Sequence, residues 1–517
     1  MQRRQLLKSM GAVGLGSMLL NPSIQALASS KVNTNAINNS SVVNYKDLFN
    51  RALANNPDLL GFSNVESNFK PQTLNIEGKI PADLNGIFFR NGPGKHERGD
   101  QRYQHLFEGD GMLQSFHIEN GKVSHHGKFI NTPKFQQEQQ AERFLYSGPE
   151  TKINKPLPVS NANMINTANT NVIPVGDDLW ALWEAGSATS INSKTLDYQQ
   201  QVTLGEEGKY GNSLKGLPFS AHPKIEANGD IWNFGLHPNG HIVLYHLSAT
   251  GQVKNVKIVN AKYRGGMLHD FLITDKHLLL ILPSLITRRA ESDSQQGYFS
   301  RVGFDNNLPM RVLVVSKTQL AVTKQYELPS GFAFHYGNAW EESNGTIHFD
   351  ASLYPNVDVL HNLSNVMQGE MNNANIDAKT ALYTLLPNGS TNHTILDTNS
   401  EFPRVCDHIT GLKNNYLYHL SSTNNSLWSD TVSSFNTNTG KEDKYIFGKE
   451  YLVEEHITVC PKRKEGSGYL IGTALHVPSK RTCLNIFNAN NLAEGPIARA
   501  WLNNHLPLGF HGNFKMA

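Results

Sequence analysis

The chain is poor in cysteine and has no excess of either charge. Its 517 residues include three cysteines, Cys406, Cys460 and Cys483, and no CxxC pair. This argues against a disulfide framework or a thiolate metal site, so we expect three buried thiols. Lysine and arginine number 46 against 44 acidic residues, with no long run of either sign. This balance argues against nucleic acid as a partner.

Long apolar runs are also absent, apart from one near the N-terminus. Arg3 and Arg4 precede an apolar, glycine-rich stretch over residues 10–20, and the small-x-small pattern of residues 26–28 follows. The stretch is short for a bilayer span and resembles a twin-arginine export signal. We expect residues 1–28 to be this signal and the protein to reach a bacterial periplasm. The twin-arginine route carries folded proteins, so a metal could be acquired before export. An ordinary secretory signal or a membrane anchor is the alternative.

Short apolar runs separated by turn residues dominate the chain from Gly61 onward. Residues 86–92, 178–183 and 228–234 are examples, and the pattern predicts strands joined by hairpins. A chain of this length exceeds one ordinary core unless a small unit repeats around an axis. The sequence therefore predicts an all-β domain over residues 61–517, most simply a β-propeller, but no fixed repeat period gives the blade count. Residues 29–60 are rich in Asn and Ser and predict a linker or arm with one short helix near residues 45–53.

Three insertions interrupt the predicted strands, at residues 134–160, 286–308 and 354–377. Loops of this length in a compact fold usually carry function or cover a site. We expect them to form a lid or tunnel over one face of the propeller. Surface decoration is the alternative.

Four of the 21 histidines lie in distinctive segments, each beside a predicted strand end with apolar or glycine neighbours. A single histidine is more often hydrogen-bonded or exposed than metal-bound, so the argument depends on context. Strands from separate blades of a propeller converge on its axis, where distant residues can share one metal ion. Neutral imidazole suits divalent iron, and four such ligands leave positions free for dioxygen. The four are His222 (SAHPK), His269 (MLHDF), His335 (FHYGNA) and His511 (GFHGNF).

Several motifs in the same order resemble the carotenoid cleavage oxygenase family, which includes stilbene-cleaving members. They are RNGP at 90–93, LFEGDGM at 106–112, HDF at 269–271 and HYGNAWE at 335–341, and the similarity runs from about Asn64 to the last residues. The resemblance implies a seven-bladed propeller under a helical and loop dome, with one iron(II) ion on the axis. It implies that His222, His269, His335 and His511 bind this ion.

The family also orients its histidines with three glutamates, which fix the second ring nitrogen. The resemblance assigns these positions to Glu184, Glu401 and Glu455. The third assignment is less direct, because Glu454 is adjacent and His456 stands where the family usually has proline. From the sequence alone, each of the three would be read as a surface or hairpin glutamate.

The resemblance implies oxidative cleavage of a conjugated carbon-carbon double bond into two carbonyl products, with both atoms of dioxygen used and no external reductant. Tyr103 and Lys134 resemble the residues by which stilbene-cleaving members bind a phenol. The stretch KFQQE at 134–138 also resembles carotenoid-cleaving members, and we favour a carotenoid or apocarotenoid over a stilbenoid. Candidate wall residues, each of which could instead be plain core, are Phe129, Phe135, Trp183, Phe332, Phe334 and Phe510.

Other classes stay open at this stage. Some relatives of the family isomerise or hydrolyse polyenes, and a propeller without iron could bind and carry a lipid. A sugar lyase or hydrolase is more remote, since it would need an acidic centre unrelated to the four histidine segments. Carotenoids reside in lipid, so peripheral membrane contact is open as well, although no docking patch stands out in the sequence.

Overall fold

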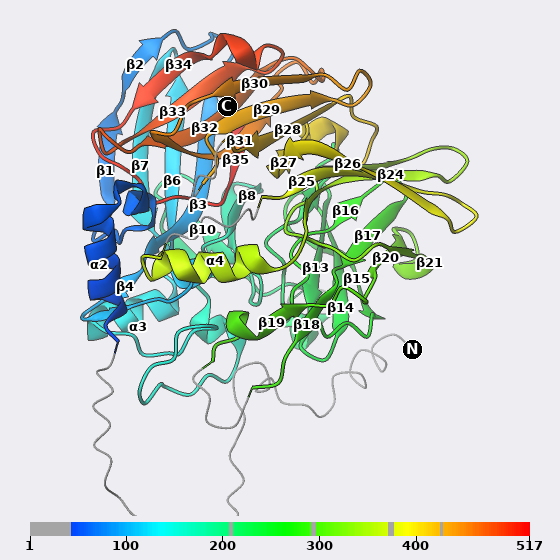
Figure 1. Cartoon of the computed structure of the whole chain (residues 1–517), viewed down its shortest axis with the longest axis horizontal. Coiled ribbons are helices and arrows are strands. Elements are labelled where there is room, and N and C mark those ends of the chain that lie inside the picture. The colour runs from blue at the N-terminus through cyan, green and yellow to red at the C-terminus, as the bar shows by residue number, and fades with distance from the viewer. Residues whose placement is uncertain (1–42, 206–209, 291–295, 371–376, 424–427) are drawn as a thin grey trace, which may run out of the picture.

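The computed structural model describes residues 43–205, 210–290, 296–370, 377–423 and 428–517. Within this part of the chain, seven antiparallel sheets of four or five strands form the blades of a β-propeller (Figure 1). The predicted all-β fold and the blade count implied by the resemblance are both confirmed. The predicted export signal, residues 1–28, lies outside the described residues, and so does the first part of the predicted linker.

Each blade contains strands that are mostly consecutive in sequence, and we number the blades along the chain. Blade 1 orders its strands β1 (Phe69–Thr73), β7 (Lys122–Phe129), β6 (Asp110–Glu119), β3 (Gly86–Lys95) and β35 (His511–Met516). Blade 2 contains β11 (Tyr198–Gln201), β10 (Thr189–Ile191), β9 (Asp178–Leu182) and β8 (Asn171–Val175). Blade 3 contains β12 (Lys224–Ile225), β13 (Ile231–Leu236), β14 (His241–Leu247) and β15 (Val253–Asn260). Blade 4 contains β16 (Leu272–Ile273), β17 (His277–Leu282), β20 (Met310–Ser316) and β21 (Ala321–Leu328).

The last three blades follow the same plan. Blade 5 contains β22 (Phe332–Ala333) and β23 (Ala339–Glu341), both paired with β24 (Ile347–Tyr354), then β25 (Lys379–Leu385) and β26 (Thr391–Asn399). Blade 6 contains β27 (Glu401–Arg404), β28 (Tyr416–Ser421), β29 (Thr431–Asn436) and β30 (Glu442–Ile446). Blade 7 orders its strands β2 (Asn75–Gly78), β34 (Pro496–Trp501), β33 (Arg481–Asn488), β32 (Tyr469–His476) and β31 (Tyr451–Val459).

Strands from the two ends of the described chain close the ring. In blade 1, β35 pairs with β3 from Gly86 opposite Met516 to Asn91 opposite His511. In blade 7, the early strand β2 pairs with β34. Both closures join segments more than 400 residues apart, so the ring forms only when the two ends of the domain meet.

The cores lie between neighbouring blades, which explains why some strands are apolar at successive positions. Strand β17, with the sequence HLLLIL, is buried at every residue after the first. Its residues pack in two different clusters, one shared with blade 3 and one with blade 5. A strand covered on both faces loses the alternation of a half-exposed sheet.

Helices and short hairpins cover one side of the propeller. The helices α2 and α3 lie with α4 in the left half of Figure 1, and α4 contacts three of the 3-10 helices, η1, η2 and η5. These elements are α2 (Tyr45–Asn55), α3 (Pro133–Ala141), α4 (Asp358–Met367), the pair β18 (Leu285–Thr287) and β19 (Val302–Phe304), and the pair β4 (Glu97–Arg98) and β5 (Gln101–Arg102). The 3-10 helices are η1 (Pro57–Phe62), η2 (Leu106–Glu108), η3 (Ala162–Ile165), η4 (Gly211–Leu214), η5 (Phe299–Arg301), η6 (Asp407–Ile409) and η7 (Leu492–Glu494).

The short helix predicted near residues 45–53 is α2, and it packs on the propeller. Phe49 is buried, and the Arg102 guanidinium lies 3.4 Å from the centre of its ring. The end of the predicted linker is therefore attached to the domain. Among the described residues, the helices are too short or too polar to cross a bilayer.

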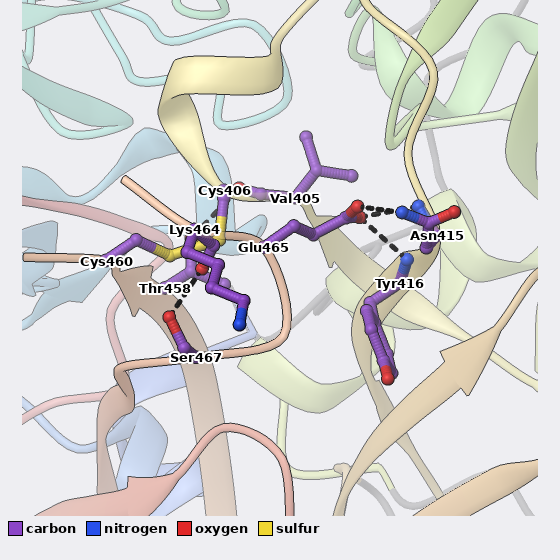
Figure 2. The surroundings of a disulfide bond; sticks show 9 residues. All are labelled: Val405, Cys406, Asn415, Tyr416, Thr458, Cys460, Lys464, Glu465 and Ser467. Atoms are coloured by element: carbon purple, nitrogen blue, oxygen red, sulfur yellow. Dashed lines mark hydrogen bonds between the residues drawn. A yellow bond between two sulfur atoms is a disulfide. The ribbon is translucent and has the colours of Figure 1, made fainter. Parts of the chain in front are cut away.

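The prediction of three free thiols is wrong for two of the cysteines. Cys406 and Cys460 form a disulfide, with Cα atoms 6.4 Å apart, and Cys483 is buried and free (Figure 2). The bonded pair is 54 residues apart in the sequence and joins blade 6 to blade 7. Spacing along the chain could not reveal this pairing, because it depends on which strands the propeller brings together.

Candidate metal centre

The four predicted histidines meet on the axis of the propeller. All four are buried, and one ring nitrogen of each lies within 4.8 Å of the corresponding nitrogens of the others. They come from different blades: His222 precedes β12, His269 precedes β16, His335 lies between β22 and β23, and His511 begins β35. A group of this kind matches an imidazole site for a divalent transition metal.

Three of the histidines are held from behind by the three predicted glutamates. His269 Nδ1 lies 2.6 Å from Glu184 Oε1, His335 Nδ1 lies 2.5 Å from Glu401 Oε2, and His511 Nδ1 lies 3.0 Å from Glu455 Oε1. An Nδ1–H that donates to a carboxylate leaves Nε2 with its lone pair free. For His222, none of the described carboxylates forms such a bond.

Two of the inward nitrogens carry no hydrogen bond, although both are buried. They are Nε2 of His222 and Nε2 of His335. Buried polar atoms are nearly always satisfied, so an orphaned pair facing the same point requires an explanation. A metal ion bound by these nitrogens provides one, and the donor set therefore fits the predicted cofactor.

The structure distinguishes Glu455 from its neighbour Glu454. Glu455 accepts hydrogen bonds from His511 Nδ1 and from the Gly512 N–H at 2.8 Å. Glu454 instead pairs with Arg90 and accepts the Gly509 N–H at 2.6 Å. Of these two glutamates, only Glu455 contacts the histidine group, in agreement with the assignment by resemblance.

Sequence reasoning missed the residues that fix the backbone behind the histidines. Asp270 accepts the Tyr336 N–H at 3.0 Å and pairs with Lys224 at 2.9 Å, so it links blades 3, 4 and 5. Asp350 accepts the N–H groups of Gly337 and Asn338 at 2.9 and 3.0 Å. Asp270 could have been suspected because it directly follows His269, whereas Asp350 gave no signal in the sequence.

Burial and neighbouring charges set the protonation of the histidines. Burial lowers the pKa of His222 well below its ordinary value, and the other three histidines lower it further. Burial also lowers the pKa of His511 to about 4, although Glu455 opposes this. For His269 burial again lowers the pKa, but the carboxylates of Glu184, Asp270 and Glu401 together outweigh it and the net pKa is raised. Neutral His222 and His511 are therefore ready to bind a metal at neutral pH.

A largely apolar cavity of about 340 Å³ opens on the histidine group. Its wall includes His269, His335 and His511 together with aromatic rings, among them Phe334, whose centre lies 5.2 Å from that of His269. Each of the three predicted insertions contributes to the wall, for example through Val159, Phe299 and Val359. All three insertions therefore contribute to the wall of the cavity, and their role as a lid stays a prediction. Of the six aromatic wall candidates, Trp183, Phe334 and Phe510 line the cavity.

Comparison with known proteins identifies the family. The family model described as retinal pigment epithelial membrane protein (RPE65) matches residues 62–516. The chain belongs to this family. Its curated relatives include apocarotenoid-15,15'-oxygenase of Synechocystis sp., 27% identical over 88% of this chain and 95% of the relative. They also include lignostilbene-alpha,beta-dioxygenase isozyme III of Sphingomonas paucimobilis, 26% identical over 90% and 99%. The predicted membership among carotenoid cleavage oxygenases is confirmed.

Solved structures confirm the fold of the RPE65 family for this chain. The cobalt-substituted Synechocystis ACO matches with a TM-score of 0.79 at 24% identity, over 89% of this chain and 98% of that one. At this identity the match concerns the seven-bladed architecture alone.

Tyr103 and Lys134, which the resemblance suggested for phenol binding, do not line the cavity, and neither do the aromatic wall candidates Phe129, Phe135 and Phe332. Lys134 Nζ is buried and lies 2.7 Å from Tyr103 OH, 2.8 Å from Asp110 and 3.0 Å from Glu138. These contacts use the ammonium group inside the protein and leave no donor for a phenol. Phe129 stacks on Phe135 and Phe332 lies behind Phe334, with ring centres 5.1 and 4.7 Å apart. A short motif could not distinguish a buried network from a binding site.

Proposed function

We propose that the protein is a non-haem iron(II) dioxygenase that cleaves a conjugated double bond of a carotenoid or apocarotenoid into two carbonyl products. The observation that carries the proposal is the group of four buried histidines, with two orphaned inward nitrogens, at the end of an apolar cavity. Membership of the RPE65 family and relatives named as oxygenases and dioxygenases support it.

The chain's own residues divide the work between holding the metal and orienting the substrate. The four histidines would hold one iron(II) ion, which supplies the binding and activation of dioxygen that side chains cannot provide. Glu184, Glu401 and Glu455 fix the ring orientations of three of the ligands. No residue acts as a nucleophile or general base in this scheme.

The aromatic wall serves the substrate. Phe107, Phe334 and Phe510 meet edge to face, with ring centres 5.5 to 6.0 Å apart between Phe107 and the other two. Such a wall excludes water, aligns an extended polyene and stabilises positive charge on it through the ring faces. A carotenoid or apocarotenoid is favoured over a stilbenoid because Lys134 is engaged with Tyr103 and two carboxylates, away from the cavity.

Product analysis under labelled dioxygen tests the proposal. The protein is loaded with iron(II) without oxygen, then given an apocarotenal and a 4-hydroxystilbene in separate reactions under ¹⁸O₂. We expect two labelled carbonyl fragments from the apocarotenal and one equivalent of iron per chain. An isomerised but unlabelled polyene would point to an isomerase instead, and a chain that binds lipid but no iron would be a carrier. In the same assay a His269→Ala variant should give no product. Its matched control is His393→Ala, which removes an exposed histidine on β26 and should behave like wild type.

We also propose that the protein is exported to the periplasm by the twin-arginine route. The disulfide between Cys406 and Cys460 supports an oxidising compartment. Replacing Arg3 and Arg4 by lysine should leave the protein in the cytoplasm, with the two cysteines reduced. Fractionation with thiol labelling measures both, and unchanged export would contradict the proposal.

A further inference from the structure

The seam between blades 6 and 7 is held by side chains, because β27 and β31 belong to different sheets. Arg404 donates from Nε and Nη2 to the two carboxylate oxygens of Glu455, at 2.9 and 3.1 Å. The next residue, Val405, accepts a hydrogen bond from Thr458 Oγ1 at 2.9 Å. Successive residues of blade 6 are thus bound to one strand of blade 7.

The third consecutive residue makes the covalent link, Cys406 to Cys460 (Figure 2). Beyond it, Glu465 accepts the N–H groups of Asn415 and Tyr416 at 2.6 and 2.8 Å, so the loop after β31 also holds the start of β28. We name the three consecutive links the seam clasp: Arg404–Glu455, Val405–Thr458 and Cys406–Cys460.

The seam clasp is attached to two of the carboxylates behind the histidines. Glu401 begins β27, five residues before Cys406, and Glu455 lies five residues before Cys460. Glu455 bonds His511 Nδ1 with one oxygen, and the same carboxylate is clamped by Arg404 from the other blade. The orientation of the His511 ring therefore depends on how firmly the two blades are joined.

We propose that the Cys406–Cys460 disulfide is a positioning element for the metal centre, and that its reduction speeds the loss of iron. The inference rests on the proposed function, since it concerns the iron that His511 would bind. Reduction adds two electrons and two protons and gives two thiols, and a small dithiol that supplies them becomes its own disulfide. Cys460 is half-buried and Cys406 is buried, so attack comes at the Cys460 side.

The expected effect is smaller than that of removing the carboxylate itself. Loss of an outer partner of a metal ligand usually lowers affinity about 10- to 100-fold. Opening the disulfide leaves Arg404 and Thr458 in place, so it should raise the iron dissociation rate by about 3- to 10-fold, which lies below that range.

The test compares iron loss from five proteins, wild type and four variants, each as the full chain, with an excess of a coloured ferrous chelator and no oxygen. Cys406→Ser with Cys460→Ser should release iron about 3- to 10-fold faster than wild type, as estimated above. Cys483→Ser, which removes the remaining buried thiol, should match wild type. In a Glu455→Gln background the double serine change should add nothing. Equal release by all proteins, or effects that multiply in the combined variant, would overturn the proposal, since a purely structural crosslink would act independently of Glu455.

A second measurement uses the unmutated protein and needs no metal. A dithiol reductant is added to folded protein, and hydrogen exchange is followed at the Gly512 amide, which donates to Glu455. We expect reduction to raise the exchange rate of this amide more than that of the Gly235 amide, in β13 of blade 3. If the exchange rate at Gly512 is unchanged after full reduction, the positioning role is contradicted, whether or not the protein binds iron. Wild-type protein that binds no iron would instead remove the proposed function.

His408 lies close enough to the two cysteines to bind a metal with them once they are reduced, so the serine variants give the decisive iron data.

Discussion

Glu454 and Glu455 offer a matched pair for testing which carboxylate supports the metal. Both are buried and both pair with an arginine, Glu454 with Arg90 and Glu455 with Arg404. Only Glu455 touches His511. Replacing either by glutamine keeps the size and removes the charge. Glu454→Gln therefore measures the effect of losing an ion pair, and Glu455→Gln adds the effect of losing the hydrogen-bond partner of a metal ligand.

For Glu455→Gln we expect iron affinity to fall about 10- to 100-fold, or about 1.4 to 2.7 kcal/mol, because a neutral amide is a weaker acceptor for the His511 N–H. For Glu454→Gln we expect iron affinity within about twofold of wild type, yet a loss of about 3 to 5 kcal/mol in unfolding free energy. This larger structural cost follows because the Arg90 side chain is 5% exposed, whereas Arg404 at 24% is partly hydrated.

Anaerobic competition with a ferrous chelator measures affinity, and denaturant unfolding of the metal-free proteins measures stability. The reasoning predicts opposite rankings: Glu455→Gln is worse for iron, and Glu454→Gln is worse for stability. If both variants lose iron in proportion to their stability, the carboxylate acts only through the fold, and the orienting role of Glu455 is refuted.

Three further predictions follow from the site. His269→Ala should abolish iron binding and turnover, as measured by iron content and product formation, and an active variant would refute the ligand assignment. The His511 pKa of about 4 in the folded protein lies below the unfolded value of about 6.5, so the unfolded state binds the proton first as the pH falls. The contribution of His511 to the stability of metal-free protein should therefore be nearly complete at pH 7 and smaller by about 2 kcal/mol at pH 5, measured as the difference between wild type and His511→Ala in denaturant titrations. Lys134→Met should destabilise the protein without changing the ratio of kcat/KM for an apocarotenal and a hydroxystilbene, and selective loss of stilbene turnover would restore Lys134 as a phenol ligand.

The strands and the insertions could be predicted because their signals are local. Apolar runs between turn residues mark strands wherever they fold, and long polar interruptions mark loops. The blade count came from the family resemblance, since blades differ too much in length to give a period. Strand β17, buried on both faces, also shows why alternation alone would misread a propeller blade.

The candidate site also combines features with a local sequence signal and features that depend on the fold. The four histidines could be picked out from their segments, but their meeting at one point required the fold. Without the family resemblance, Glu454 and Glu455 could not have been separated, because the irregularity in β31 between Val453 and His456 determines which carboxylate faces the histidines. The Cys406–Cys460 pair was missed because its partners meet only across a blade boundary.

Closure of the ring by β35 has a consequence for how the protein matures. His511 is the first residue of that strand, and the same strand completes blade 1 against β3. Any chain that stops before residue 511, whether truncated or still on the ribosome, holds three of the four histidines and an open first blade. Domains that close through distant segments fold late, after their early parts have been made. The proposed iron(II) ion could therefore meet all four histidines only after the propeller ring has closed, so the complete metal site exists only in a finished chain.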